Sequence, residues 1–365
     1  MRYGHLLLAM NSTCQIDQYA QGISFRTLTH IIKDDIMTTR SRVVYFNGKF
    51  VPEAEAKISI YDSALMFGDM VFEMTRSFNK VQFKLKEHIE RLYAGLKILR
   101  IPLDITPQQM EKACMETIEA NDNLFASDDE HRLMIDVSRG LLGIYQGIEG
   151  LQAGPNLIIA DFPLRWTVAG MGQLFESGIN AVVTSQRAIP SSLLDPKIKN
   201  RSRIHYLMAT IEASQIDGNN NWALLLDPDG FIAEGTGDNF FIIKNGTVIT
   251  PEGRNILRGV SRSYIIEEVC PALNIPVVEK NIEPYDVYTA DEAFMSGTPF
   301  CMLPVTSLNG NPIGKGTVGS IFSDLIQRWS SNTGVDIINQ IRTWDASRPS
   351  ASSSNAPTPY RFKSK

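Results

Sequence analysis

Short apolar runs separated by turn residues fill the first half of the chain. Residues 43–51 (VVYFNGKFV) place two such runs around Asn47-Gly48, a pair typical of a tight hairpin turn. Further apolar runs predict strands over residues 57–61, 132–138 and 157–162. Within residues 65–83, strands are predicted on both sides of Gly68 and on both sides of the Asn79-Lys80 turn.

Two stretches of this half repeat apolar residues at helical spacing instead. Ile89, Leu92, Leu96 and Leu99 predict a helix over residues 85–99. The sequence Thr106-Pro107-Gln108-Gln109 is a capping box with proline at the first helical position, and it predicts a helix that runs to about Glu119.

The second half adds more strands and helices. Strands are predicted over residues 180–185, 222–226, 231–233, 240–243, 277–279 and 293–295. Helices are predicted over 204–213, from Ser261 onward and near 318–329. In the first of these helices Ile204, Leu207, Met208 and Ile211 fall at helical spacing, so we expect them to form a buried face. The mixture indicates an α+β fold.

Composition suggests a division of the 365 residues into domains. We expect an N-terminal extension over 1–36, with Met37 as an alternative start, a small domain over 37–164 and a large domain over 173–344. Residues 165–172 have the composition of a linker. Residues 345–365 are rich in serine, proline, alanine and asparagine, which predicts a disordered tail.

Charge and cysteine content narrow the class of protein. The net charge is −5 and basic residues do not cluster, so nucleic acid is not an expected partner. The 4 cysteines are scattered, which argues for a reducing, cytoplasmic location and against a disulfide frame or a metal site. No apolar run approaches the length of a membrane span.

Candidate chemistry begins with the lysines of residues 194–213. Lys197 and Lys199 precede an apolar helical pattern, and a lysine at such a place can be desolvated, which makes its amine a nucleophile toward carbonyls. The alternative is that both are solvated loop charges. Three later features would suit a phosphate-bearing aldehyde cofactor: Glu234 at a strand end, Gly259-Val260-Ser261 at a helix start, and Ser296-Gly297-Thr298 after a strand.

In this order and spacing the features resemble the class IV pyridoxal-phosphate aminotransferases, in particular the branched-chain enzymes. The segments that carry the resemblance are EHIERLYAGLKIL, LDPKIK, GFIAEGTGDNFFIIKNG, ILRGVSR and DEAFMSGTPFCMLPV. The resemblance implies a two-domain fold like that of D-amino acid aminotransferase, with pyridoxal 5′-phosphate between the domains. It also implies a homodimer that exchanges an amino group between an amino acid and a 2-oxo acid.

The resemblance assigns roles residue by residue. The family lysine lies thirteen residues before the glutamate of Glu212-Ala213, which selects Lys199 as the catalytic residue that forms a Schiff base with the cofactor. Glu234 matches the glutamate that keeps the pyridine nitrogen protonated. The positions that match the phosphate-binding residues are Arg91, Val260, Ser261 and Thr298.

The sequence departs from the family at positions that concern the substrate. Ser202-Arg203 replaces an Asn-Tyr pair, Arg132 and Met134 stand where branched-chain enzymes carry tyrosine and arginine, and Pro299 has no amide hydrogen where an alanine is usual. These departures leave the substrate open. We predict a branched-chain or other apolar L-amino acid as donor, which the apolar side chains of Phe67, Met70, Phe72 and Met134 would suit, with Arg132 or Arg203 holding its carboxylate. The residues expected to bind it are Phe67, Phe72, Arg132, Arg203 and Thr298.

Three alternatives stay open at this point. One is elimination, as in the aminodeoxychorismate lyases, and another is transfer from a D-amino acid or an (R)-amine, both within the same family. The third is a scaffold without catalytic activity.

Overall fold

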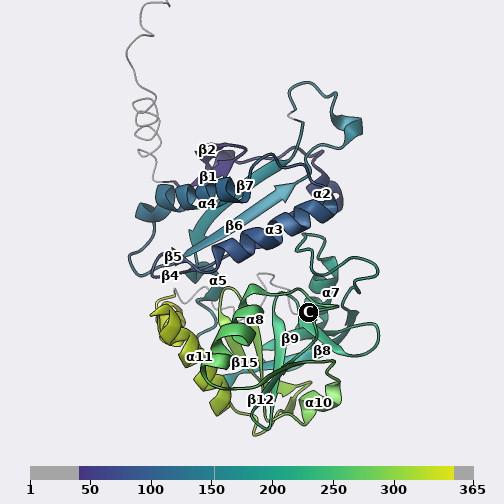
Figure 1. Cartoon of the computed structure of the whole chain (residues 1–365), viewed down its shortest axis with the longest axis vertical. Helices are drawn as coiled ribbons and strands as arrows, with labels where there is room; N and C mark the ends of the chain where they lie inside the picture. Colours follow the sequence, from purple (N-terminus) through teal and green to yellow (C-terminus); the bar gives the residue numbers. More distant parts are fainter. Residues whose placement is uncertain (1–40, 152, 349–365) are drawn as a thin grey trace, which may run out of the picture. The chain divides into compact units, whose positions relative to one another are not determined.

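Two large β-sheets organise the part of the chain that the structure describes, which is residues 41–151 and 153–348 of a computed structural model (Figure 1). The predicted N-terminal extension and nearly all of the predicted tail lie outside these residues. Each sheet has its own hydrophobic cluster. The domain boundaries drawn from composition stay a prediction.

The first sheet is antiparallel, with strand order β2-β1-β7-β6-β3. The expected hairpin at Asn47-Gly48 joins its first two strands. The bounds are β1 Val43–Phe46, β2 Lys49–Pro52, β3 Met70–Met74, β6 His131–Ser138 and β7 Asn156–Pro163. A small hairpin of β4 Ser77–Phe78 and β5 Val81–Gln82 turns at Asn79-Lys80, as predicted.

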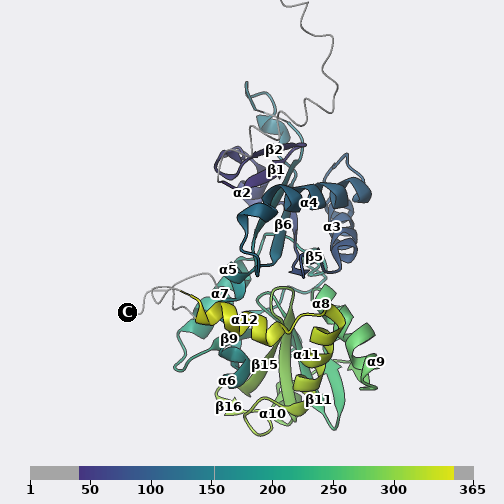
Figure 2. The ribbon, with the colours of Figure 1, turned by 90° about the vertical axis from the view of Figure 1, so that its left-hand side faces the viewer.

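Two helices, α3 and α4, cover one face of this sheet, and neither of them lies on the opposite face (Figure 2). They are α3 Leu85–Leu99, with the predicted bounds, and α4 Pro107–Asn121, which begins with the predicted capping box at Thr106. Along β6 the alternate residues Leu133, Ile135 and Val137 pack against the helices. Arg132, Met134 and Asp136 therefore project from the other face.

The strand predicted over residues 57–61 is wrong, and so is the strand before Gly68. The structure has a 3-10 turn, η1 Glu53–Glu55, and then a short helix, α2 Ser63–Phe67. The Asp62 side chain accepts a hydrogen bond from the Ala64 amide at 2.8 Å, and Gly68 ends the helix with φ 68°. These end caps outweigh the apolar run between them.

The second sheet has nine strands, with order β10-β9-β8-β15-β14-β11-β12-β13 and β16 beside β15. Every strand predicted for this half is present. The bounds are β8 Ile179–Arg187, β9 Asn221–Leu226, β10 Ile232–Gly235, β11 Asn239–Lys244, β12 Thr247–Thr250, β13 Val277–Glu279, β14 Glu292–Gly297, β15 Cys301–Leu308 and β16 Asn311–Pro312.

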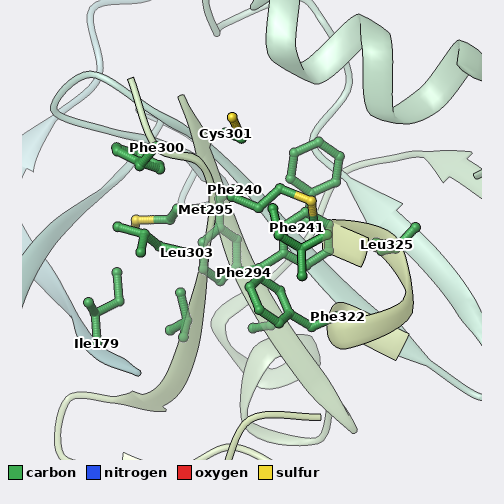
Figure 3. Packing of buried hydrophobic residues seen from close by; sticks show 14 of the residues in the cluster. Ile179, Phe240, Phe241, Phe294, Met295, Phe300, Cys301, Leu303, Phe322 and Leu325 are labelled. Carbon is green, nitrogen blue, oxygen red and sulfur yellow. The ribbon is translucent and has the colours of Figure 1, made fainter. Parts of the chain in front are cut away.

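Aromatic side chains fill the core between this sheet and its helices (Figure 3). Phe241 of β11 stacks on Phe294 of β14, with ring centroids 4.6 Å apart, and Phe322 of a C-terminal helix packs beside them.

The helices of the second half are short except for α7, α11 and α12. Their bounds are α5 Arg165–Val168, α6 Leu174–Ser177, α7 Ile204–Ser214, α8 Val260–Tyr264, the π-helical η4 Ile265–Val269, α9 Cys270–Ala272, α10 Pro284–Tyr288, α11 Ser320–Thr333 and α12 Ile337–Ala346. Two 3-10 turns, η2 Asp122–Leu124 and η3 Gly143–Tyr145, lie in the first half.

The buried face predicted for the helix at 204–213 is wrong. Ile204 is 71% exposed and Met208 46%, Leu207 and Ile211 are half-buried, and the buried positions are Ala209 and Ala213. Helix α7 packs on β8 and β9 through these alanines. Small side chains let the helix backbone approach the sheet closely, so Ile204 and Met208 are left facing outward.

The structure has helices at two of the segments predicted to be a linker and a tail. The segment 165–172 contains α5, and its Val168 and Met171 are buried in the larger core. The tail was expected to begin at Asp345, but α12 continues to Ala346 because Trp344 is buried and holds the helix in place. Across residues 41–151 and 153–348 no helix is long and apolar enough to cross a membrane.

Candidate active site

Lys199 is held against β3 by backbone hydrogen bonds. The Phe72 amide donates to the Lys199 carbonyl at 2.9 Å, and the Arg201 amide donates to the Met70 carbonyl at 3.1 Å. The Lys199 side chain enters a cavity, where its amine lies 4.7 Å from the centroid of the Phe72 ring. Burial, and then the charges of Arg203 and Arg91, hold the pKa of this amine well below its usual range.

Lys197 has a different environment from Lys199. Its amine lies 2.8 Å from a carboxylate oxygen of Asp195 and donates to the Arg254 carbonyl at 3.2 Å. Of the two lysines, only Lys199 lines the cavity. The geometry therefore favours Lys199 as the nucleophilic amine.

Glu234 is buried at the end of β10 and is fixed by three hydrogen bonds. Its Oε1 accepts from the Tyr206 hydroxyl at 2.7 Å, and its Oε2 accepts from the Leu257 amide at 3.0 Å and from the Asn239 side-chain amide at 3.1 Å. Burial raises the pKa of Glu234 to about 6, although these donors oppose the rise. A cationic partner at the free side of the carboxylate would stabilise its charged form.

Gly259 lets the start of α8 lie close to the Glu234 network. A Cβ atom at this position would lie 2.1 Å from Oδ1 of Asn239. The Asn239 amide group also donates to the Leu257 carbonyl at 2.9 Å. A side chain at position 259 would therefore displace the Asn239 amide group from its hydrogen bonds to Glu234 and Leu257.

Arg91 of α3 reaches the same cavity while it is anchored by Glu73. Its Nε and Nη2 donate to the two carboxylate oxygens of Glu73 at 2.6 and 2.8 Å, and its Nη1 donates to the Arg258 carbonyl at 2.8 Å. His88 contacts the same carboxylate at 2.7 Å. Burial alone would raise the pKa of Glu73, but Arg91 and His88 hold it well below its usual value.

One cavity brings together every residue predicted to bind the cofactor. Two further polar atoms on its wall, Oγ of Ser296 and Oδ1 of Asp238, are buried without a hydrogen-bond partner in the structure. Burial, with the nearby Glu234 charge, raises the pKa of Asp238 to about 8. The predicted residues that line the cavity are Arg91, Lys199, Glu234, Val260, Ser261 and Thr298. The guanidinium groups of Arg91 and Arg203, the unpaired polar atoms and the fixed Glu234 carboxylate suit a phosphorylated heterocycle.

The residues predicted to bind substrate are not all close together. Arg203 and Thr298 line the cavity, and Phe72 lies against the Lys199 amine. Arg132 is buried further along the same sheet face. Phe67, at the end of α2, is 65% exposed and lines neither cavity around Lys199, so its role stays a prediction.

Sequence reasoning missed three residues of the site: Tyr206, Asn239 and Glu73. Tyr206 follows Arg203 by three residues, a spacing that places both on one side of a helix start, and the Arg203 guanidinium lies 4.6 Å from its ring centroid. The acid pattern of the sequence gives no sign that Glu73 pairs with Arg91. Those two residues meet only because α3 packs on β3.

Comparison with known proteins identifies the class to which this fold and site belong. The family model of amino-transferase class IV matches residues 70–308, and the chain belongs to this family. The predicted family, α+β fold and aminotransferase class are thereby confirmed.

Individual relatives agree with this assignment. A protein of Methanocaldococcus jannaschii, provisionally named a branched-chain-amino-acid aminotransferase, is 37% identical over 295 residues, which cover 78% of this chain and 97% of the relative. The Escherichia coli branched-chain amino acid aminotransferase structure has a TM-score of 0.71 and 28% identity, covering 80% of this chain and 94% of that one. The Thermobaculum terrenum enzyme of the same name, solved in its PLP-form, has a TM-score of 0.69 and 25% identity, covering 83% and 97%. This holo-form supports the predicted cofactor, pyridoxal 5′-phosphate.

Proposed function

We propose that this aminotransferase transfers the amino group of a branched-chain or other apolar L-amino acid to a 2-oxo acid, with pyridoxal 5′-phosphate as cofactor. The observation that carries the proposal is the single cavity in which a desolvated Lys199 faces a hydrogen-bonded Glu234 and the Arg91 guanidinium. The branched-chain enzymes among the relatives support the choice of donor.

The residues of the cavity divide the work. When bound, the cofactor serves as an electron sink for the substrate carbon. Lys199 would hold the cofactor aldehyde through its amine and, once displaced by the donor, would move the proton between the substrate carbon and the cofactor 4′-carbon. Glu234 would keep the pyridine nitrogen protonated. Arg91, the Val260 amide, Ser261 and Thr298 would hold the phosphate.

A screen of amino donors tests this function. The purified enzyme, supplied with cofactor, is given leucine, D-alanine or an (R)-amine without a carboxylate, with 2-oxoglutarate or pyruvate as acceptor. Leucine is expected to be the best of the three donors. If only the amine reacts, the branched-chain proposal is wrong, and release of pyruvate from an aminodeoxychorismate substrate without an acceptor would indicate the lyase instead.

Arg91→Ala is expected to weaken both cofactor retention and the fold. The fold is affected because Arg91 neutralises the buried Glu73 carboxylate. Loss of the guanidinium leaves Glu73 buried with only His88, and breaking such a pair costs roughly 3–5 kcal/mol. Retained cofactor after dialysis and the free energy of unfolding are the two measurements.

The double variant Glu73→Gln/Arg91→Ala separates the two effects of Arg91. It removes the buried charge along with its partner, so most of the lost stability should return. The cofactor should still dissociate during dialysis, because the phosphate lacks its guanidinium. A double variant that holds the cofactor as firmly as the parent would remove Arg91 from the phosphate site.

We also propose a cytoplasmic homodimer. Large apolar side chains on two surfaces support self-association: Ile60, Leu65 and Phe67 around α2, and Ile204 and Met208 on α7. The buried, unpaired cysteines Cys114, Cys270 and Cys301 suit a reducing compartment. Light scattering on the purified protein measures the mass, and a monomer at micromolar concentration would contradict the dimer.

A further inference from the structure

The segment that carries Lys199 joins the first sheet through two backbone hydrogen bonds to β3. The Phe72 amide donates to the Lys199 carbonyl, and the Arg201 amide donates to the Met70 carbonyl. Residues 188–203, which connect β8 to α7, contain no longer strand and no helix. The position of the Lys199 side chain therefore depends on the contacts that hold this connection on the sheet.

Arg201 adds a side-chain contact that reaches the next strand. Asp136 of β6 is the register partner of Phe72 in β3. Nε and Nη2 of Arg201 both donate to Oδ1 of Asp136, at 3.0 and 2.8 Å. The same guanidinium lies 3.7 Å from the centroid of the Phe72 ring. The Arg201 side chain thus passes over β3 and ties the connection to two strands of the sheet.

The Phe72 ring is shared by Arg201 and the Lys199 amine, which lies 4.7 Å from its centroid. The two residues are two positions apart in a segment that pairs with β3, so their side chains project to the same side. Fixing the Arg201 guanidinium over this ring therefore restricts the backbone that carries the Lys199 amine.

The ion pair between Arg201 and Asp136 is more enclosed than an ordinary surface pair. The Asp136 side chain is 10% exposed and that of Arg201 33%. Burial raises the pKa of Asp136, and the Arg201 charge opposes the rise. Across the described residues the Asp136 carboxylate has no other ion pair or hydrogen bond from a side chain. Exposed ion pairs contribute little, but an enclosed one can hold a fixed geometry.

We propose that Arg201 and Asp136 form a positioning pair that holds the connection on β3 and thereby fixes the Lys199 amine over the Phe72 ring. The inference rests on the proposed function, in which Lys199 would hold the cofactor and move the substrate proton. Neither Arg201 nor Asp136 lines the cavities around Lys199, so the pair acts through the lysine. A displacement of about 1 Å at a reacting group can cost about 10²-fold in rate.

The double variant Asp136→Asn/Arg201→Met is the main test. It removes both charges together, so no unpaired buried charge is left to unfold the protein. In single turnovers of the holoenzyme with leucine, we expect the proton-transfer step to slow by about 10- to 10²-fold, with a smaller change in KM. A double variant with the parent rate would overturn the proposal.

The pKa of the Lys199 amine provides a measurement that needs no turnover. The full chain, freed of cofactor by dialysis, is labelled with trinitrobenzenesulfonate over a range of pH, and peptide mapping follows Lys199. Release of the connection would expose the amine to water and move its pKa up toward its ordinary value. The other charges that face this amine, those of Arg91, Arg203, Glu73 and Glu234, are the same in every variant.

The single variants distinguish positioning from a simple effect of charge. Asp136→Asn leaves the Arg201 cation unbalanced, which by charge alone would lower the pKa of Lys199, whereas Arg201→Met would raise it. The two effects would cancel in the double variant. Positioning predicts a raised pKa in the double variant, so a pKa equal to that of the parent overturns the proposal even where the rate falls.

Arg139→Met is the matched control. Arg139 pairs with Asp69 at the end of the same sheet, and its side chain is 32% exposed, close to the value for Arg201. We expect a lower melting temperature but the parent values of the Lys199 pKa and the proton-transfer rate. Equal kinetic losses in Arg139→Met and the double variant would reduce the pair to a structural role. Arg201→Lys should recover part of the rate, because it keeps the charge but not the two-nitrogen contact.

The two proposals fail in different ways. If the parent enzyme converts no amino donor, the transamination is wrong, and the titration of Lys199 still tests the pair. If the parent transaminates leucine and the double variant keeps both the rate and the pKa of Lys199, only the positioning role is wrong.

Discussion

Lys199→Ala is expected to lose at least about 10³-fold in turnover, since it removes the amine proposed to hold the cofactor and to move the substrate proton. The absorbance band of the cofactor bound covalently to the lysine should disappear as well. Lys197→Ala is the matched control, two residues away, with its amine committed to Asp195 and the Arg254 carbonyl. This control should keep the absorbance and nearly all of the activity.

Chemical labelling checks the same prediction in the unaltered protein. Borohydride reduction of the holoenzyme fixes the cofactor to the amine that holds it, and peptide mapping then identifies that residue. We expect the label on Lys199, because of the two lysines it is the one in the cavity and its pKa is lowered by burial. A label on Lys197 would show that the assignment from sequence spacing is displaced by two residues.

Glu234→Gln is expected to slow the proton-transfer step by about 10²-fold or more. The substitution keeps the size of the side chain and can keep the hydrogen bonds from Leu257 and Asn239, but it removes the negative charge that would keep the pyridine nitrogen protonated. Electrostatic contributions of roughly 3 kcal/mol are typical for such groups. A single-turnover reaction with leucine deuterated at its α-carbon isolates this step.

Tyr206→Phe is the matched control for Glu234. It removes the hydroxyl that donates to Glu234 at 2.7 Å and leaves the carboxylate charge in place. The carboxylate keeps its charge and its hydrogen bonds from Leu257 and Asn239, so the expected loss is smaller than that of Glu234→Gln. Full activity of Glu234→Gln would exclude Glu234 from the reaction, and equal losses in both variants would mean that geometry matters more than charge.

Local sequence patterns determined much of the fold. Helix α3 has the predicted bounds because its apolar residues repeat at helical spacing, and α4 begins at the predicted capping box. The hairpin at Asn47-Gly48 and the strands of the second sheet also follow from short-range signals. The same kind of pattern failed at Ser63–Phe67, where residues at the two ends of the segment favour a helix over the strand suggested by its apolar run.

The sequence by itself also determined the family and the cofactor class, and it predicted Lys199 over Lys197, because motif spacing along the chain carries that information. Only the tertiary structure decided which groups meet across elements. Arg91 finds Glu73, Tyr206 finds Glu234, and Arg201 finds Asp136 although 65 residues separate them in the sequence. These pairings depend on strand register and on helix packing, which place distant residues together without any local signal. Helix α7 shows the same limit, since close packing of its alanines, and not its apolar periodicity, decided which face is buried.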